Sequence, residues 1–321
     1  MNVKVFITID TEEDSWSDYK AIGNCCDNIS QIPKIQELFD HYKAIPTYLV
    51  SYSVVVDRDS ASILRNILKR NRCEIGTHCH PWNTPPFEED SNNLSTMLHK
   101  LPPKMVREKV ETLHKAITKS FMMEPVCFRG GRWSFCSEVS KVLYDFGYHI
   151  DTSITPYVDW TEYDGPDFTD APSSIYRFDP ENVLEEKKDG GLIEVPVTTG
   201  FLQKNFKMCN SIRKRILRGR LARYHFLGAL DRLKILNFRI LSPELSNGEE
   251  MIKLSKRLIL SGHSSLNMTF HSNSLLPGEN PFIRNQDDLK GFLRNLEVFL
   301  RFAKEEGMSF LPLSGAKGLA E

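Results

Sequence analysis

The sequence predicts one α/β domain in which parallel strands alternate with helices and close into a barrel. Short runs rich in β-branched and aromatic residues recur along the 321 residues, and they are too short to be helices. Between most of these runs lie segments whose apolar residues have helical spacing. Alternation of strand and helix is typical of a parallel sheet. About seven or eight such units in one chain favour a barrel over two separate domains.

The individual elements follow from this pattern. The runs predicted as strands cover residues 3–9, 45–50, 73–77, 126–128, 148–153, 193–197, 266–270 and 309–313. The segments predicted as helices cover residues 29–42, 61–70, 104–121, 137–146, 249–260 and 287–305. Pro102 and Pro103 come just before the third helix, where a helix start tolerates proline.

Two stretches interrupt the alternation. Residues 155–188, with their Pro, Gly and Asp, predict a long excursion, and residues 201–262 predict a helical insertion. Residues 201–240 hold eleven Lys and Arg against one acid, Asp231, a local net charge of +10. A solvated helical face would explain this charge, and so would a basic surface for an anionic glycan, a lipid-linked substrate or a membrane. Neither stretch forces a domain boundary, so residues 1–321 are predicted to form one domain.

The bulk composition is that of an ordinary soluble globular protein, 40% hydrophobic and 26% charged. The net charge of −1 gives no reason to expect nucleic-acid binding. No run approaches the roughly 18 apolar residues of a transmembrane helix, and the first ten residues lack the pattern of a signal peptide. The seven cysteines contain no CxxC pair and fit free thiols in a reducing compartment. We therefore expect a cytoplasmic protein.

Polar residues gather where the predicted strands end. The residues at these ends are Asp10, Thr11 and Glu12, then His78 and His80, Arg129 and Arg132, Asp151, and finally His271. A parallel barrel brings the carboxyl ends of its strands to one face, which is where such folds carry reactive residues. The sequence therefore predicts that these side chains meet in one site.

His78 and His80 are candidate metal ligands. Residues two apart on an extended strand point to the same side, so both imidazoles could face one ion. Asp10 and Glu12 have the same spacing at another strand end, and a cation would offset the crowding of negative charge there. Zinc and its neighbours accept imidazole nitrogen together with carboxylate oxygen. The alternative is that one histidine has only a packing or hydrogen-bonding role.

The other candidates gain weight from their position. Arg129 and Arg132 flank two glycines, and an arginine there could hold a carboxylate by a bidentate contact; a surface arginine on a turn is the alternative. His271, at the end of an apolar run, would more often be structural if it stood alone.

The four tryptophans fall within about ten residues of these strand ends, and sugars bind by stacking on aromatic rings. They are Trp16, Trp82, Trp133 and Trp160. Burial of all four in the core is the alternative reading.

Together these residues resemble the polysaccharide deacetylase family, also called the NodB-homology or carbohydrate esterase family 4 group. The similar motifs are residues 7–12, 74–78, 128–132, 151–160 and 268–271, and the resemblance covers a little over half of the chain. It implies a distorted (β/α)7 barrel that removes acetyl groups from sugar amides with a divalent metal.

The motifs also depart from the family pattern. Thr11 occupies the place of a metal-binding aspartate, so Glu12 would bind instead. Trp82 occupies the place of the second histidine, so His80 would substitute for it. These departures resemble a divergent Asp-x-Glu branch that is often linked to surface-polysaccharide synthesis.

The resemblance implies a role for each matching residue. Glu12, His78 and His80 would hold a divalent ion, with zinc favoured. Asp10 would be the general base, kept ionised by Arg129. His271 would protonate the departing amine, oriented by Asp151 or Asp159. Side chains near the strand ends would contact the sugar, namely Trp82, Arg132, Trp133 and Trp160.

The predicted activity is therefore metal-dependent deacetylation of an N-acetylated sugar in surface-polysaccharide biosynthesis. The sugar could be free, nucleotide-linked or lipid-linked, and the basic residues 201–240 could make a peripheral contact. A metal-independent amide hydrolase of the same superfamily is one alternative. A metallo-phosphoesterase would usually need more histidines, and an inactive glycan-binding barrel would not need both Asp10 and His271.

Overall fold

Seven parallel strands form the centre of the molecule. The computed structural model describes residues 3–16, 18–87, 96–218 and 226–320. The parallel strands, in their order across the sheet, are β10 (Ser265–His271), β1 (Lys4–Thr11), β2 (Thr47–Val50), β3 (Glu74–Cys79), β4 (Cys127–Gly130), β5 (Ile150–Asp151) and β7 (Leu192–Glu194). At one edge, β6 (Tyr176–Phe178) pairs antiparallel with β7, and β11 (Ser309–Phe310) pairs parallel with the first residues of β1.

The ring is closed by irregular chain rather than by a regular strand pair. Beyond β7, the amide of Val195 still donates to Asp151 O of β5 at 2.9 Å. Three residues later the amide of Thr198 donates to Asn267 O of β10 at 3.0 Å, and Leu241 O accepts from the amide of Thr269 at 3.1 Å. The predicted fold, a distorted barrel, is thereby confirmed.

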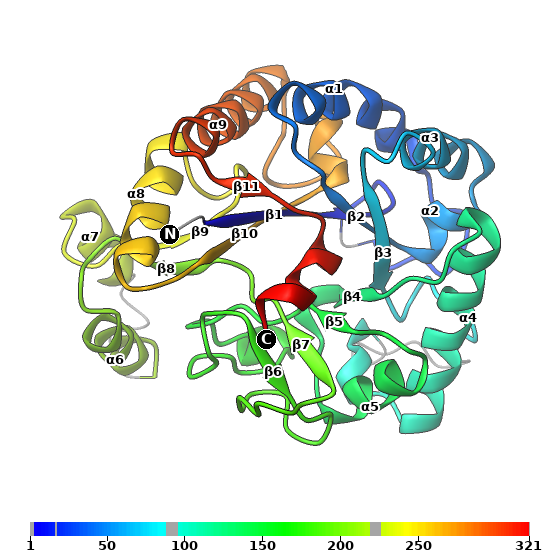
Figure 1. Ribbon diagram of the computed structural model, residues 1–321, viewed down its shortest axis with the longest axis horizontal. Coiled ribbons are helices and arrows are strands. Elements are labelled where there is room, and N and C mark those ends of the chain that lie inside the picture. Colours follow the sequence, from blue (N-terminus) through cyan, green and yellow to red (C-terminus); the bar gives the residue numbers. More distant parts are fainter. Residues whose placement is uncertain (1–2, 17, 88–95, 219–225, 321) are drawn as a thin grey trace.

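Amphipathic helices surround the strands (Figure 1). They are α1 (Ile32–Tyr42), α2 (Tyr52–Val56), α3 (Arg58–Leu68), α4 (Pro103–Phe121), α5 (Ser137–Asp145), α8 (Gly248–Leu260) and α9 (Gln286–Glu305). In α9, Phe292, Leu296 and Phe299 are buried at i, i+4 and i+7, so one stripe faces the sheet. The Asn285 side chain accepts from the free amides at the start of α9 and so defines where the helix begins. All six helices expected from apolar spacing are present.

Several short elements lie outside the predicted strands, and two short helices lie within the predicted helical insertion. Short 3-10 turns occur at η1 (Asp27–Gln31), η3 (Leu98–Lys100), η4 (Gly131–Trp133), η5 (Thr161–Tyr163), η7 (Ser272–Leu275) and η8 (Leu313–Leu319). A two-stranded antiparallel ribbon, β8 (Thr199–Phe201) and β9 (Phe238–Ile240), brackets two helices, α6 (Phe206–Leu217) and α7 (Phe226–Arg232). These two helices lie at one edge of the molecule, whereas α8 packs on α9 (Figure 1). Part of the basic stretch, residues 219–225, lies outside the described residues.

The insertion has a small apolar core of its own. Phe201, Cys209 and Leu236 are buried together, with Phe206 and Phe238 packed against them. In the part of the chain that the structure describes, no helix is both long enough and apolar enough to cross a membrane.

Candidate active site

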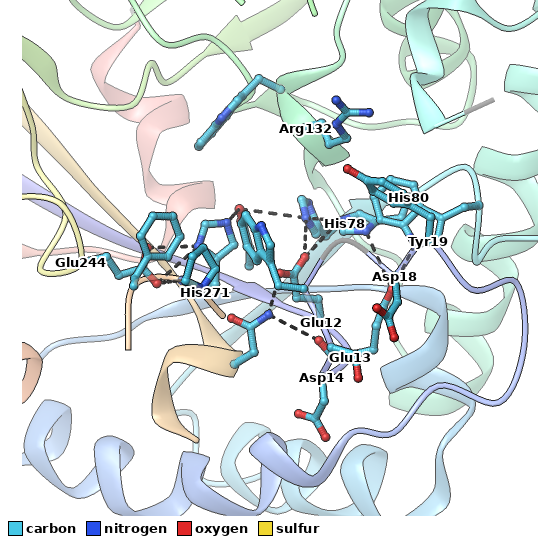
Figure 2. Close-up of a pocket in the computed structure, with 18 of the residues that line it drawn as sticks. Glu12, Glu13, Asp14, Asp18, Tyr19, His78, His80, Arg132, Glu244 and His271 are labelled. Atoms are coloured by element: carbon cyan, nitrogen blue, oxygen red, sulfur yellow. Dashed lines mark hydrogen bonds and ion pairs between the residues drawn. The ribbon is translucent and has the colours of Figure 1, made fainter. Parts of the chain in front are cut away.

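A pocket of about 580 Å³ opens at the carboxyl ends of the strands. The register explains why polar residues meet there, because Asp10 lies opposite His271 and His78 lies opposite Arg129 on neighbouring strands. Asp10, Glu12, His78, His80 and His271 all line the pocket, as Figure 2 shows for those it labels. With Arg132, six of the predicted strand-end residues therefore meet in this pocket, whereas Thr11, Arg129 and Asp151 are not among its lining residues.

Two imidazoles and one carboxylate converge inside this pocket. The Nε2 atoms of His78 and His80 are 2.6 Å apart. Glu12 Oε2 lies 3.1 Å from His80 Nε2 and 3.5 Å from His78 Nε2. The other ring nitrogen of His78, Nδ1, lies 3.2 Å from Arg129 O and can donate to it, which leaves Nε2 with its lone pair toward Glu12.

These three donors fit a divalent cation such as zinc. Tetrahedral zinc, with ligands at about 2.0–2.1 Å, needs donor atoms about 3.3–3.4 Å apart. The three edges of the donor triangle, 2.6, 3.1 and 3.5 Å, bracket that value and require shifts of less than about an ångström. All three side chains are buried. Holding their lone-pair atoms this close together costs free energy unless a cation or a shared proton lies between them.

The surroundings of Glu12 hold its carboxylate in place. Asn273 donates to Glu12 Oε1 at 3.1 Å, and the Ser272 hydroxyl accepts from the Glu12 amide at 3.1 Å. Burial alone would raise the pKa of Glu12, but hydrogen bonds from His78 and His80 outweigh it and hold the pKa below its usual range. For His80 the effect of burial is the opposite, because burial lowers the pKa of a histidine. The nearby carboxylates, Glu12 first, outweigh burial and raise the pKa of His80.

The next two acids, Glu13 and Asp14, have hydrogen-bond partners in the surrounding loops. Glu13 accepts from Asn83 at 2.7 Å and from the Trp82 indole at 3.3 Å, which joins the β1 loop to the β3 loop. Asp14 accepts from the side chain of Asn28 at 2.6 Å and from two backbone amides at η1. The negative charge that the sequence shows as one cluster is thus divided among three environments.

Asp10 is paired with a fully buried arginine. Arg129 Nη1 donates to Asp10 Oδ1 at 2.5 Å. Burial would raise the pKa of Asp10, but the positive charges around it, Arg129 first and then His78 and His271, together outweigh burial and lower that pKa. The free oxygen, Oδ2, faces His271 Nε2 at 3.8 Å and His78 Nε2 at 4.0 Å. Asp10 is therefore an ionised carboxylate beside the three donors Glu12, His78 and His80, with one oxygen left to accept a proton.

His271 is oriented by Glu244, a residue that the sequence did not point to. Glu244 Oε2 lies 3.1 Å from His271 Nδ1, and Glu244 Oε1 accepts from the His271 amide at 2.8 Å. Burial would lower the pKa of His271, but the Glu244 carboxylate outweighs it, and the pKa rises to about 10. Glu244 lies between β9 and α8, and its local sequence carries no motif; only the fold brings it to β10.

The predicted orienting role of Asp151 or Asp159 is therefore wrong, because each has other partners. Asp151 is buried and accepts from the amide and the hydroxyl of Ser153, each at 2.8 Å. Burial raises the pKa of Asp151 to about 6, next to the equally buried Glu194. Asp159 accepts from the hydroxyl of Thr161 at 2.6 Å, on the excursion after β5.

Comparisons with known proteins agree with this architecture. No family model matches the chain, and no curated protein matches it. A solved structure from Mycobacterium smegmatis, provisionally named a polysaccharide deacetylase, is 15% identical with a TM-score of 0.55 and covers 99% of this chain and 89% of that one. A provisionally named glycoside hydrolase/deacetylase from Parabacteroides distasonis is 10% identical with a TM-score of 0.59 and covers 99% of this chain and 71% of that one.

The chain has the polysaccharide deacetylase fold. The resemblance predicted from its motifs is confirmed at the level of that fold.

Aromatic side chains form the rim of the site in this deacetylase fold. The residues predicted to contact the sugar all line the pocket, together with Trp16; they are Trp82, Arg132, Trp133 and Trp160. Trp133 and Trp160 stack with ring centroids 6.3 Å apart. Arg132 and Trp133 both have left-handed backbone, with φ of 54° and 59°, in the turn after β4. Such backbone is costly for residues with side chains, and here it directs two of them at the pocket.

Proposed function

We propose that this protein is a metal-dependent hydrolase that removes the acetyl group from an N-acetylated sugar. The observation that carries the proposal is the convergence of His78, His80 and Glu12 on one point beside a separate acid–base pair. Asp10 and His271 make up that pair, and each is held by a partner of opposite charge. Glycan binding alone would need neither the metal donors nor the pair.

A divalent cation held by Glu12, His78 and His80 would polarise the acetyl carbonyl and acidify a nearby water. Zinc is favoured, because two imidazole nitrogens and one carboxylate oxygen are a donor set of catalytic zinc sites. Hydrogen bonds at His78 Nδ1 and Glu12 Oε1 aim these side chains before any ion arrives.

Asp10 is the general base in this proposal. Its Oδ2 atom takes the proton of the attacking water, while Arg129 on Oδ1 keeps the carboxylate ionised at neutral pH. His271 is the general acid. Its Nε2 atom lies on the side of Asp10 Oδ2. The imidazole is protonated at neutral pH because the Glu244 carboxylate lies against Nδ1, so it can donate a proton to the departing amine.

The aromatic rim favours a sugar as substrate, because rings such as Trp133 and Trp160 stack on the apolar faces of pyranoses. The provisional names of the two structures with the same fold also support a glycan substrate. We place the reaction in surface-polysaccharide biosynthesis on the resemblance of the motifs alone. The sugar could be free, nucleotide-linked or lipid-linked.

The test is Asp10→Asn, assayed by acetate release from N-acetylglucosamine oligomers. Loss of a general base should lower turnover about a hundred- to ten-thousand-fold. Asp18→Asn, the same change on an exposed carboxylate at the pocket rim, is the matched control and should stay near wild-type activity. Near-normal turnover by Asp10→Asn would refute its role. Activity that survives removal of metal by a chelator would identify a metal-independent amide hydrolase instead.

A further inference from the structure

The insertion between β8 and β9 exposes a surface of cations and large apolar side chains. We call it the insertion face, and it consists of Lys204, Lys207, Met208, Ile212, Arg215, Leu233, Lys234 and Ile235. Met208 and Ile212 are 54% and 42% exposed, and Leu233 and Ile235 are 67% and 58% exposed. Apolar side chains this large are rarely left in water side by side without a partner.

The spacing places these residues together. In α6, Met208, Ile212 and Arg215 recur at i, i+4 and i+7 and form one exposed stripe, about a quarter-turn around the helix from the buried Cys209 and Ile216. The turn that carries Leu233 and Ile235 lies next to the start of α6, because the Gln203 side chain donates to Lys234 O at 3.1 Å.

Much of the positive charge of residues 201–240 is already compensated. Lys214 pairs with Asp170 at 2.6 Å, Arg218 pairs with Asp167 at 2.8 Å, and Arg239 pairs with two acids. Arg213 donates to Tyr157 O. Within the described part of the insertion, the remaining cations have no acidic partner; they are Lys204, Lys207, Arg215, Arg232 and Lys234.

We propose that the insertion face docks on an anionic lipid bilayer. A solvated helical face would need the cations but not the exposed Leu233 and Ile235 between them. Apolar side chains interleaved with unpaired Lys and Arg are typical of surfaces that bind the headgroup region. The apolar side chains enter the lipid, and the Lys and Arg side chains contact the negatively charged headgroups. No spanning helix is required for such a contact.

Docking would bring the pocket close to the lipid. Ile240, at the end of β9, lines the pocket and follows Ile235 by five residues, a reach of at most about 18 Å. On the proposed function, a sugar carried on a lipid headgroup would then lie within reach of His271. The docking itself does not depend on that function and is tested without any turnover.

The experiment is co-sedimentation with vesicles of phosphatidylcholine, with or without about 30 mol% phosphatidylserine. The full chain should bind the anionic vesicles and not the neutral ones, and it should dissociate as salt rises toward about 1 M. Each basic residue near such a surface is worth about fivefold in affinity, so Lys207→Glu with Arg215→Glu should weaken binding at least about 25-fold.

Lys69→Glu with Lys119→Glu makes the same change of net charge just after α3 and on α4, across the barrel from the insertion (Figure 1), and should bind as wild type does. Leu233→Ser with Ile235→Ser keeps the charge and should also weaken binding. No binding to anionic vesicles overturns the proposal. Equal weakening by both charge variants also overturns it, since net charge alone would then explain the association.

Discussion

Glu244→Gln tests the least expected contact of the site, the carboxylate that holds His271. Glutamine keeps the size and the hydrogen-bond acceptor of Glu244 but removes the charge that lies 3.1 Å from His271 Nδ1. Burial by itself lowers the pKa of His271, and the Glu244 carboxylate is the largest influence in the other direction. Asp10 and Glu12 also raise that pKa and remain in the variant, so we expect the pKa of His271 to fall from about 10 toward its ordinary value.

The size of the effect follows from the proton equilibrium. With a pKa near 10, His271 is protonated at pH 8 in almost every molecule. With an ordinary pKa of about 6.5, only about 3% of molecules carry the proton at pH 8, which would lower an acid-limited rate about 30-fold. At pH 6 the loss would be less than about twofold, so the variant should fail mainly on the alkaline side.

Titration of the His271 imidazole by NMR in metal-free protein measures the shift directly, and the pH–rate profile measures its consequence. Glu279→Gln is the matched control, because Glu279 is another glutamate that accepts a hydrogen bond, from the Ser15 amide rather than from a histidine. If His271 titrated at the same pH in wild type and in Glu244→Gln, the assignment of Glu244 as its orienting partner would be refuted.

Three further predictions concern the cluster and the buried charges. Protein purified without chelator should carry about one divalent ion per chain by elemental analysis, and His80→Ala should weaken its binding at least about 100-fold; unchanged metal content would contradict the cluster. Because burial raises the pKa of Asp151 from 3.8 to about 6, the unfolding free energy should fall by about 3 kcal/mol as pH rises through that range. Glu194→Gln should flatten this loss in denaturant unfolding, and parallel curves would count against the buried pair. Arg129→Met, which strands Asp10 as a buried charge, should destabilise the fold by about 3–5 kcal/mol, measurable by the same unfolding assay.

The barrel was predictable because its signals are local. Apolar residues at helical spacing within one segment, such as Phe292, Leu296 and Phe299 in α9, show which face will be buried before any partner is known. The three-residue strands β6, β8 and β9 escaped prediction, because three residues carry too little periodicity and their pairing partners are distant in sequence.

The sequence by itself determined which chemical groups stand at the strand ends, since alternation on a strand sends His78 and His80 to one side wherever the strand lies. Tertiary structure alone decided the pairings. Glu244 rather than Asp151 or Asp159 meets His271, because the irregular closure of the barrel brings the chain after β9 against β10. Electrostatic interactions depend on the distance between charges in the folded structure, and the order of residues in the sequence does not give that distance.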